Sequence, residues 1–205
     1  MNDQVPPGLH AAVLAAGPST RFGSPKQLIQ LAGTPVLHWA VSNTARAAGR
    51  SVSVVLGAAA GEIAPLLRRS EATVIVNRGW REGLASSVRA AVNAVPPGCD
   101  GLLLVLADQV AVTEDDLRRL VAAWRRHPVL IAAALYDGAP GLPAIFPGWA
   151  FPDLLDLRGE GDPRIVIHRH VDRVVRIPMP AAAIDVNTPE DLLEIDARGP
   201  GRAKL

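Results

Sequence analysis

Two cationic side chains and several small residues follow an apolar run near the start of the chain. The run His10–Ala16 ends at Gly17, and Arg21 and Lys26 then stand among Gly, Ser, Thr and Pro residues. Small residues let backbone N–H groups approach phosphate oxygens closely, and Arg and Lys neutralise the phosphate charge. This pattern predicts a buried strand that opens into a loop for a polyanion.

Two familiar phosphate-binding loops do not fit this segment. The Walker pattern has a Gly-Lys pair separated from its first glycine by four residues. Counted from Gly17, that pair would stand at positions 22 and 23, where this chain has Phe22 and Gly23. The dinucleotide-binding fingerprint requires a glycine at the second position after Gly17, where this chain has Ser19. The sequence of this segment therefore predicts neither a P-loop nor a nicotinamide-binding turn.

A carboxylate follows a second apolar run. Gly101–Leu106 is predicted to be a buried strand, and Asp108 is the first charged residue after it. A buried aspartate needs a partner, and at the carboxyl end of a strand it can face a crevice and hold a cation. Mg²⁺ takes one or two carboxylates and shares its other positions with phosphate and water. The alternative role, capping the helix predicted from Thr113, requires too long a gap for a direct N-cap.

A second candidate ligand lies near the end of the chain, in the segment DVNTPEDL that begins at Asp185. The period of two in an extended backbone puts Asp185 and Asn187 on the same side. We expect Asp185 to complete a magnesium site with Asp108, with a loop or capping role as the alternative. The acids that follow Thr188 are explained more simply as first-turn residues favoured by the helix dipole.

A third segment, Asn77–Val88, leads from a predicted strand into a predicted helix. Its glycines and its two adjacent serines suit a helix N-terminus that meets an anion or a ribose, and a capped helix start is the alternative. A nucleophile elbow does not fit, because the Gly-x-Ser-x-Gly spacing is absent. The Pro/Gly-rich zone Gly138–Phe151 is predicted to be an inserted loop or a small lobe over the site.

The elements that must position these residues alternate between strand and helix. This alternation predicts a three-layer α/β domain with a largely parallel sheet. Because ligands sit outside the carboxyl ends of such strands, Gly17–Lys26 and the segment after Leu106 belong on one rim. The predicted strands are apolar runs, several without interruption, at Ala11–Ala16, Val52–Leu56, Thr73–Val76, Gly101–Leu106, Val129–Leu135 and Arg173–Ile177.

Capping signals place the helices between these strands. Thr34-Pro35 predicts an N-cap followed by proline at the first helical position, with Gly49 after the helix end. Thr113 predicts an N-cap with acids in the first turn, and Thr188 predicts the same start for the last helix. Further helices are predicted over 61–69 and 86–95.

Length and composition limit the class of protein. The 205 residues fit one domain, with a core over about 9–197 and a frayed tail over 198–205. A net charge of +1 predicts no broad surface for nucleic acid or anionic membranes. The single cysteine, Cys99, excludes an internal disulfide. The start MNDQVPPG carries no signal pattern and no run reaches membrane-spanning length, so we expect a cytoplasmic protein.

The segment Leu14–Leu28 resembles the signature loop of the sugar-phosphate and cofactor nucleotidyltransferases, LAAG-x-S-x-R-x-G-x-x-K-x-L. The resemblance implies a three-layer, Rossmann-like nucleotidyltransferase fold with a mostly parallel mixed sheet. It implies that Arg21, Lys26 and Asp108 are catalytic and that Asp108 and Asp185 hold Mg²⁺. The nucleotide-binding residues that it implies are Leu14, Ala15, Ala16, Gly17, Ser19, Thr20, Arg21, Gly23, Lys26 and Ala107.

Within these enzymes the chain is most similar to the MobA-like NTP transferases that act on the molybdenum cofactor. Asn77–Ser87 resembles their N-x-x-W/Y-x-x-G-L-x-x-S segment, and Gly138–Pro147 resembles G-x-P-G-H-P-x-x-F, with Leu142 in place of His. A second departure is Pro163-Arg164, where many relatives have Gly-Ala-Arg after Gly-Asp. The acceptor-binding residues that the resemblance implies are Asn77, Glu82, Gly83, Ser86, Ser87, Gly141, Pro143 and Asp162.

The implied activity is transfer of a nucleoside monophosphate from a triphosphate to a phosphorylated acceptor, with release of pyrophosphate. The resemblance favours CMP transfer to molybdopterin, with CTP preferred over GTP, and a molybdenum hydroxylase or its maturation factor as protein partner. The alternatives are a guanylyltransferase on the same cofactor, transfer to another phosphate acceptor, and a redox or chaperone relative that uses the same fold.

Overall fold

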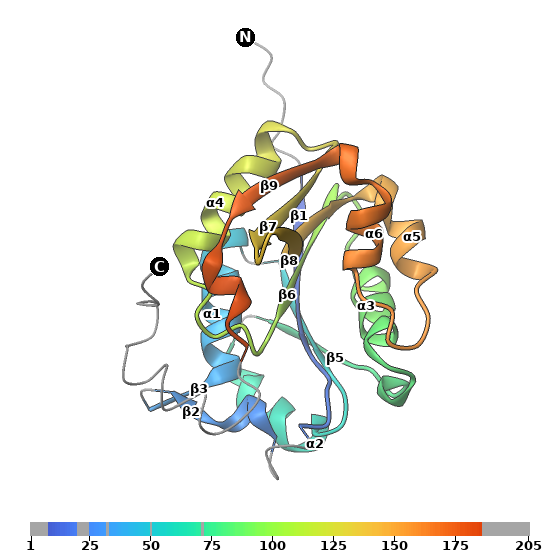
Figure 1. The fold of residues 1–205 in the computed structure, drawn as a ribbon. Coiled ribbons are helices and arrows are strands. Elements are labelled where there is room, and N and C mark those ends of the chain that lie inside the picture. Colours follow the sequence, from blue (N-terminus) through green and yellow to red (C-terminus); the bar gives the residue numbers. More distant parts are fainter. Residues whose placement is uncertain (1–7, 20–24, 32, 50, 71, 186–205) are drawn as a thin grey trace.

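The computed structural model describes residues 8–19, 25–31, 33–49, 51–70 and 72–185. A seven-stranded sheet in the order β5-β4-β1-β6-β8-β7-β9 forms its centre (Figure 1). The strands are β1 (Leu9–Ala15), β4 (Val52–Leu56), β5 (Thr73–Val76), β6 (Gly101–Leu106), β7 (Ile131–Tyr136), β8 (Ala139–Pro147) and β9 (Val174–Pro178). A separate two-stranded hairpin joins β2 (Gln30–Leu31) to β3 (Thr34–Pro35).

The sheet is mixed but mostly parallel, as the sequence predicted. β1 pairs in parallel with β4 and β6, β4 with β5, and β7 with β9, whereas β8 runs antiparallel to β6 and β7. Helices cover both faces of this sheet (Figure 1). They are α1 (Val36–Ala48), α2 (Ala60–Ile63), α3 (Leu84–Asn93), α4 (Glu114–Arg126), α5 (Phe151–Leu155) and α6 (Arg164–Arg169).

The two faces of the sheet carry separate hydrophobic cores, and β1 contributes to both. Ala11 and Val13 belong to the cluster under α1 and α4, which also holds Trp124. Ala12 and Leu14 belong to the cluster under α3, α5 and α6. Successive side chains of a strand point to opposite faces, so a strand covered on both faces must be apolar at every position. This explains the uninterrupted apolar runs and confirms the three-layer prediction.

The prediction of an inserted loop or lobe over Gly138–Phe151 was wrong. Most of this zone forms β8, an interior strand between β6 and β7. Its pairing with β7 shifts from Ala133↔Ala144 to Ala134↔Gly141, so Leu142 and Pro143 have no partner in that ladder. A bulge of this kind accommodates a proline, which has no N–H to donate to a neighbouring strand.

The predicted caps and helices were right in some places and wrong in others. Thr113 caps α4 through a capping box with Asp116, as expected. Thr34 does not cap α1, because it pairs in β3 and Pro35 takes the N-cap position. The helix expected over 61–69 is the short α2 followed by a 3₁₀ helix at Ala64–Arg69, and the one expected over 86–95 begins earlier, at Leu84. The helix predicted from Thr188 lies outside the described residues.

No helix within the described ranges combines the length and the apolar character that crossing a membrane requires.

Candidate functional site

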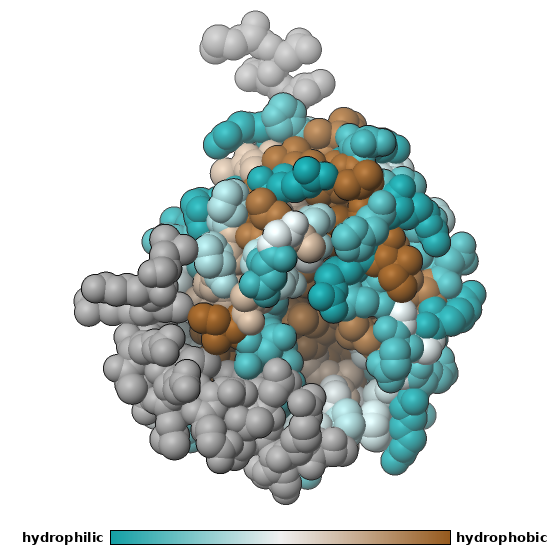
Figure 2. Space-filling view, viewed as in Figure 1, coloured by the Kyte–Doolittle hydropathy of each residue, from teal (hydrophilic) through white to brown (hydrophobic). Residues whose placement is uncertain are grey.

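A cavity of about 670 Å³ opens at the carboxyl ends of β1 and β6. Its lining comes from four parts of the sequence, within 14–27, 80–87 and 106–108 and at Glu160, that the fold brings to one rim, as predicted for ligands of such sheets. On the face shown in Figure 2, hydrophobic surface lies recessed between hydrophilic side chains. The lining residues are Leu14, Ala15, Ala16, Gly17, Pro18, Lys26, Gln27, Trp80, Arg81, Gly83, Leu84, Ser87, Leu106, Ala107, Asp108 and Glu160.

The end of β1 is fixed by hydrogen bonds to its backbone. The N–H of Ala107 donates to the carbonyl of Leu14 over 3.1 Å. The buried Gln27 side chain donates from Nε2 to the carbonyl of Ala15 over 2.9 Å and to that of Gly17 over 3.3 Å. A Cβ atom on Gly17 would meet none of the described residues within 4 Å. The glycine therefore leaves free space where the strand opens into the cavity.

Ser19 organises the loop that follows. Its backbone φ is +52°, a value that few residues other than glycine adopt. Its Oγ accepts from the backbone N–H of Lys26 over 3.0 Å and donates to Oε1 of Gln27 over 3.3 Å. The serine therefore ties the two sides of the loop together. Thr20, Arg21 and Gly23, predicted to bind nucleotide, lie outside the described residues.

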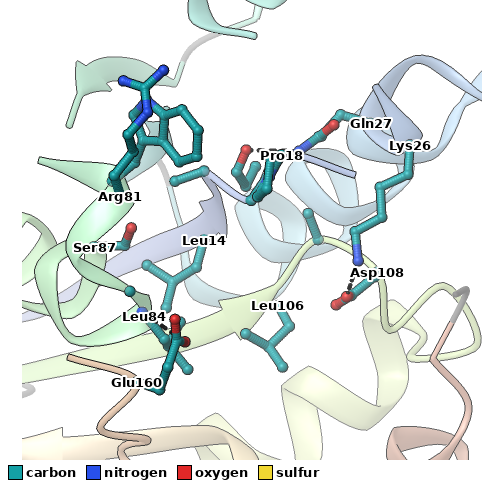
Figure 3. Close-up of a pocket in the computed structure, with 16 residues that line it drawn as sticks. Leu14, Pro18, Lys26, Gln27, Arg81, Leu84, Ser87, Leu106, Asp108 and Glu160 are labelled. Atoms are coloured by element: carbon teal, nitrogen blue, oxygen red, sulfur yellow. Dashed lines mark hydrogen bonds and ion pairs between the residues drawn. The ribbon is translucent and has the colours of Figure 1, made fainter. Parts of the chain in front are cut away.

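Lys26 and Asp108 meet at one end of the cavity (Figure 3). Nζ of Lys26 lies 2.5 Å from Oδ2 of Asp108, and the two side chains are 22 % and 21 % exposed. The ion pair joins the short 3₁₀ helix Lys26–Leu28 to the turn after β6. The lysine thus neutralises a carboxylate that otherwise has little access to solvent.

Asp185 lies within electrostatic reach of this pair. Desolvation of its carboxyl and the negative charge of Asp108 raise the pKa of Asp185 to about 6, while Lys26 and Arg164 act in the opposite direction. The residue as a whole is exposed, so the carboxyl is held near Asp108 at the edge of the protein. Two acids far apart in the sequence and one lysine therefore come together.

These residues fit a hard divalent cation. Two carboxylates that repel each other, one of them held by an ammonium group, supply oxygen ligands and a need for positive charge. Among the described residues no group of three or more His, Cys, Asp or Glu side chains forms a metal site. A pair of carboxylates matches a cation that completes its shell with phosphate oxygens and water rather than with protein alone.

The opposite end of the cavity is built by the start of α3. Gly83 and Ser87 line it together with Leu84 and Glu160 (Figure 3). Gly83 has φ +102°, and a Cβ there would lie 2.4 Å from the carbonyl oxygen of Gly159. Only glycine fits this position, where the loop at 159–160 packs against the first turn of the helix. Ala85 donates its N–H to Gly159 over 3.1 Å, which fixes that contact.

Other predicted acceptor residues in this segment are used internally in the described structure. Nδ2 of Asn77 donates to Oγ of Ser86 over 2.8 Å and to Oγ of Ser87 over 3.0 Å. The backbone N–H of Gly79 donates to Oδ1 of Asn77 over 2.9 Å. Glu82 accepts from Arg89 over 2.6 Å. Asn77, Glu82 and Ser86 thus lie outside the cavity lining and shape the turn that carries Gly83 and Ser87.

The remaining predicted acceptor residues belong to different elements and also lie outside the lining of this cavity. Gly141 and Pro143 are buried in β8, where a Cβ on Gly141 would meet the Tyr136 hydroxyl oxygen at 2.4 Å. Asp162 accepts from the backbone N–H of Arg164 over 2.7 Å and pairs with its guanidinium over 2.8 Å. The structure therefore does not gather all the predicted acceptor residues around one cavity.

Several lining residues were missed by sequence reasoning. Gln27 stands at a position that the signature motif leaves open, and it is the buried residue of the 3₁₀ helix Lys26–Leu28, which no spacing in the sequence indicates. Glu160 lies in the segment noted only as a departure from the family pattern. Trp80 and Arg81 stack on each other, with the guanidinium carbon 4.4 Å from the ring centroid. Arg81 was not predicted, whereas Trp80 stands at the W/Y position of the segment that resembles N-x-x-W/Y-x-x-G-L-x-x-S.

Comparison with protein families gives one match, which covers most of the chain. Residues 11–174 match the model of the MobA-like NTP transferase domain. The match includes Lys26 and Asp108 and ends before Asp185. The bifunctional protein GlmU from Thermotoga maritima is 33 % identical over 122 residues, which are 58 % of this chain and 26 % of GlmU. The chain thus spans about a quarter of the length of the curated relatives that it matches.

Solved structures share the fold over nearly the whole chain. Rv0371c from Mycobacterium tuberculosis H37Rv superposes with a TM-score of 0.80 at 28 % identity, covering 93 % of this chain and 98 % of that one. A second structure of that protein is a complex with manganese, at a TM-score of 0.78, 26 % identity, and coverage of 94 % and 100 %. Molybdopterin-guanine dinucleotide biosynthesis protein A from Archaeoglobus fulgidus has a TM-score of 0.69 at 20 % identity, covering 90 % and 95 %, and shows the fold alone.

Proposed function

The chain belongs to the MobA-like NTP transferase family, and on that premise we propose that it transfers a nucleotidyl group from a nucleoside triphosphate to a phosphorylated acceptor. The observation that carries the proposal is the meeting of Lys26, Asp108 and Asp185 beside a cavity that begins at Leu14–Gly17. Cations and carboxylates of this kind, next to an open glycine loop, suit a metal–triphosphate.

The triphosphate is proposed to lie across the rim. Its base and ribose pack near Leu14–Gly17, with Ala107 beside them, and its phosphates follow the loop toward Lys26. Free space at Gly17 admits the ligand close to the backbone. Arg21, together with Thr20 and Gly23, is proposed to complete the phosphate contacts. Arg21 and Lys26 then stabilise the negative charge that builds up on the leaving pyrophosphate.

The reaction needs positioning and charge neutralisation more than acid–base chemistry. An oxygen of the acceptor phosphate attacks the α-phosphorus and forms a new P–O bond. The bond from the α-phosphorus to the α–β bridging oxygen breaks, and pyrophosphate leaves with its electron pair. A phosphate dianion is already a nucleophile, so no protein base has to remove a proton.

The carboxylates of Asp108 and Asp185 would hold Mg²⁺. When bound, the ion supplies Lewis-acid neutralisation of phosphate oxygens at the reacting centre. The chain's own contribution is to keep the two acids close together and to hold Lys26 beside them until substrate arrives. The manganese in one structure of Rv0371c supports a divalent ion in a relative with this fold.

For the substrates, we propose CTP rather than GTP and molybdopterin as the acceptor. The support is the likeness of Asn77–Ser87 and Gly138–Pro147 to the segments of molybdenum cofactor enzymes. Gly83 and Ser87 are the proposed acceptor residues that line the cavity. The proposed role of Asn77, Glu82 and Ser86 is to hold the turn that carries Gly83 and Ser87. Asp162 is proposed to meet the acceptor beyond that cavity, whereas Gly141 and Pro143, which are buried in β8, are proposed to shape the sheet beside it.

One assay tests this proposal. The protein is incubated with CTP or GTP and molybdopterin, with and without Mg²⁺, and released pyrophosphate is measured. We expect release that requires both the acceptor and the metal, and that is faster with CTP. Pyrophosphate release with a sugar phosphate but not with molybdopterin would show that the proposed acceptor is wrong and that the sugar phosphate takes its place. No release with any acceptor, despite triphosphate binding, would contradict nucleotidyl transfer.

A further inference from the structure

Gln109 bridges segments that lie far apart in the sequence. Its side chain is 4 % exposed. Nε2 donates to the carbonyl of Ala182 over 2.8 Å and to the carbonyl of Leu142 over 3.0 Å. Gln109 directly follows Asp108, and Ala182 lies three residues before Asp185. One amide group therefore links the chain beside one acid to the chain beside the other, and both to β8.

A second contact runs parallel to this bridge. Ile184, the residue before Asp185, packs against a small hydrophobic cluster of Leu31, Val36 and Val110. Val110 directly follows Gln109. The residues after Asp108 and the residues before Asp185 thus meet through a buried hydrogen bond and through apolar packing. The 3₁₀ helix Pro180–Ala183 is held between them.

The two acids need such a restraint because they repel each other. Two carboxylates that share one site carry like charges, which push their segments apart. Among the described residues, Lys26 pairs with Asp108 and Arg164 pairs with Asp162, and neither forms an ion pair with Asp185. The hydrogen bond from Gln109 and the packing of Ile184 are therefore contacts that can fix the second segment before a cation binds.

The amide of Gln109 is satisfied on its donor side. Both of its hydrogen bonds go to carbonyls of buried residues, Leu142 and Ala182, which an apolar side chain would leave without a partner. Its Oε1 atom is buried and has no hydrogen-bond partner within the described residues. The contacts that Gln109 makes are therefore the two that join the segments beside the acids.

We propose that Gln109 is a positioning residue that holds the Asp185 segment against Asp108 and so preorganises the pair of carboxylates for a divalent cation. The inference rests on the proposed function for the identity of that site. Residues that orient metal ligands from behind typically change metal affinity 10–100-fold when they are replaced. Gln109 acts here on the backbone next to the ligands rather than on the carboxylates themselves.

The test measures Mn²⁺ binding to the full chain in the absence of nucleotide. Electron paramagnetic resonance detects the Mn²⁺ that stays free in the titration. Gln109→Met keeps the size of the side chain and removes both donors, and we expect its Kd for Mn²⁺ to rise about 10–100-fold. Val54→Ala, a change in the core of β4, serves as a control that loses stability and is expected to bind Mn²⁺ within twofold of the unchanged protein. Should Gln109→Met not fold, as judged by circular dichroism, Gln109→Asn replaces it, because its shorter amide cannot reach both carbonyls.

A double-mutant cycle separates positioning from a general structural effect. If Gln109 acts through Asp185, Gln109→Met should weaken Mn²⁺ binding far less in an Asp185→Asn background than in the unchanged chain. Equal losses in both backgrounds, or a folded Gln109 variant with unchanged Mn²⁺ affinity, would overturn the inference. Pyrophosphate release by the unchanged chain is measured in parallel. An active chain with an unaffected Gln109 variant refutes only the positioning role, whereas an inactive chain refutes the proposed function.

Discussion

Nζ of Lys26 lies 2.5 Å from Oδ2 of Asp108, across a separation of 82 residues in the sequence. The lysine places a positive charge on the carboxylate to which we assign a divalent cation (Figure 3). The ammonium group and a bound metal ion would carry like charges side by side and would compete for this carboxylate. We therefore expect Lys26 to exchange the carboxylate for a phosphate when the metal and the triphosphate bind.

Lys26→Met is expected to have opposite effects on the two ligands. Without the competing ammonium group, Mn²⁺ should bind the free protein about tenfold more tightly, equivalent to about 1.4 kcal/mol. CTP should bind more weakly, because a phosphate contact is lost. Calorimetric titrations with each ligand separately measure both effects. Arg46→Met, which removes an exposed cation paired with Glu114 over 3.8 Å, is the control and should leave both affinities nearly unchanged. Weaker Mn²⁺ binding by Lys26→Met would refute the competition.

Asp108→Asn is expected to lower the rate of pyrophosphate release by about a hundredfold or more, because several kcal/mol of charge stabilisation are lost. The amide keeps the shape of the side chain, so the melting temperature should change little. Asp156→Asn, an exposed acid at the end of α5, controls for the loss of a charge. A variant at position 108 that keeps most of the activity would remove this residue from the mechanism.

Gly17→Ala is expected to lower the affinity for CTP without lowering the stability of the fold. The added methyl group meets no atom of the described residues within 4 Å, and replacing glycine restricts the unfolded chain. The melting temperature should therefore stay the same or rise slightly. The affinity for CTP should fall, because the methyl group enters the space proposed for the nucleotide. Gly61→Ala is matched to it, since a Cβ there also meets nothing within 4 Å, and it should leave CTP affinity unchanged. Unaltered CTP binding by Gly17→Ala would place the ligand elsewhere.

Stability is expected to fall with acid through His10. The imidazole is buried in β1 between the Oγ atoms of Ser51 at 2.8 Å and Ser53 at 3.0 Å, and burial lowers the pKa of His10 below its usual value of 6.5. The unfolded chain takes up a proton at His10 near pH 6.5, whereas the folded chain does so only at lower pH. Unfolding therefore binds a proton in this range, and the free energy of unfolding decreases as the pH drops below about 6.5.

Urea unfolding at several pH values between 7 and 5 measures this effect. His10→Gln has no group that titrates there, so its free energy of unfolding should fall less steeply over the same range than that of the unchanged chain. Parallel curves for the two proteins would show that His10 does not contribute.

Three strands were predicted with their observed bounds: Val52–Leu56, Thr73–Val76 and Gly101–Leu106. The first and last are interior strands covered on both faces, which leaves an almost unbroken apolar run, whereas Thr73–Val76 is a short apolar run at the edge of the sheet. β8 was missed because its prolines and glycines are typical of loops. Only the antiparallel partners on both sides and the shift in register explain how that segment forms an interior strand.

Site residues that belong to a local sequence motif could be predicted from the sequence. Those that depend on contacts between distant segments could not. Lys26 and Asp108 were singled out by sequence, and the structure brings them together. The bridge from Gln109 to Ala182 left no sequence signal, because a single glutamine after an aspartate has no period or spacing. The internal use of Asn77 likewise depends on two serines whose directions only the fold determines.

The most direct measurement of the central claim is a crystal structure with Mn²⁺ and CTP, in which anomalous scattering locates the metal. We predict one strong anomalous peak between the carboxylates of Asp108 and Asp185, with Lys26 turned from Asp108 to a phosphate of the nucleotide. A peak bound by neither acid, or a triphosphate outside the cavity at the ends of β1 and β6, would contradict the account.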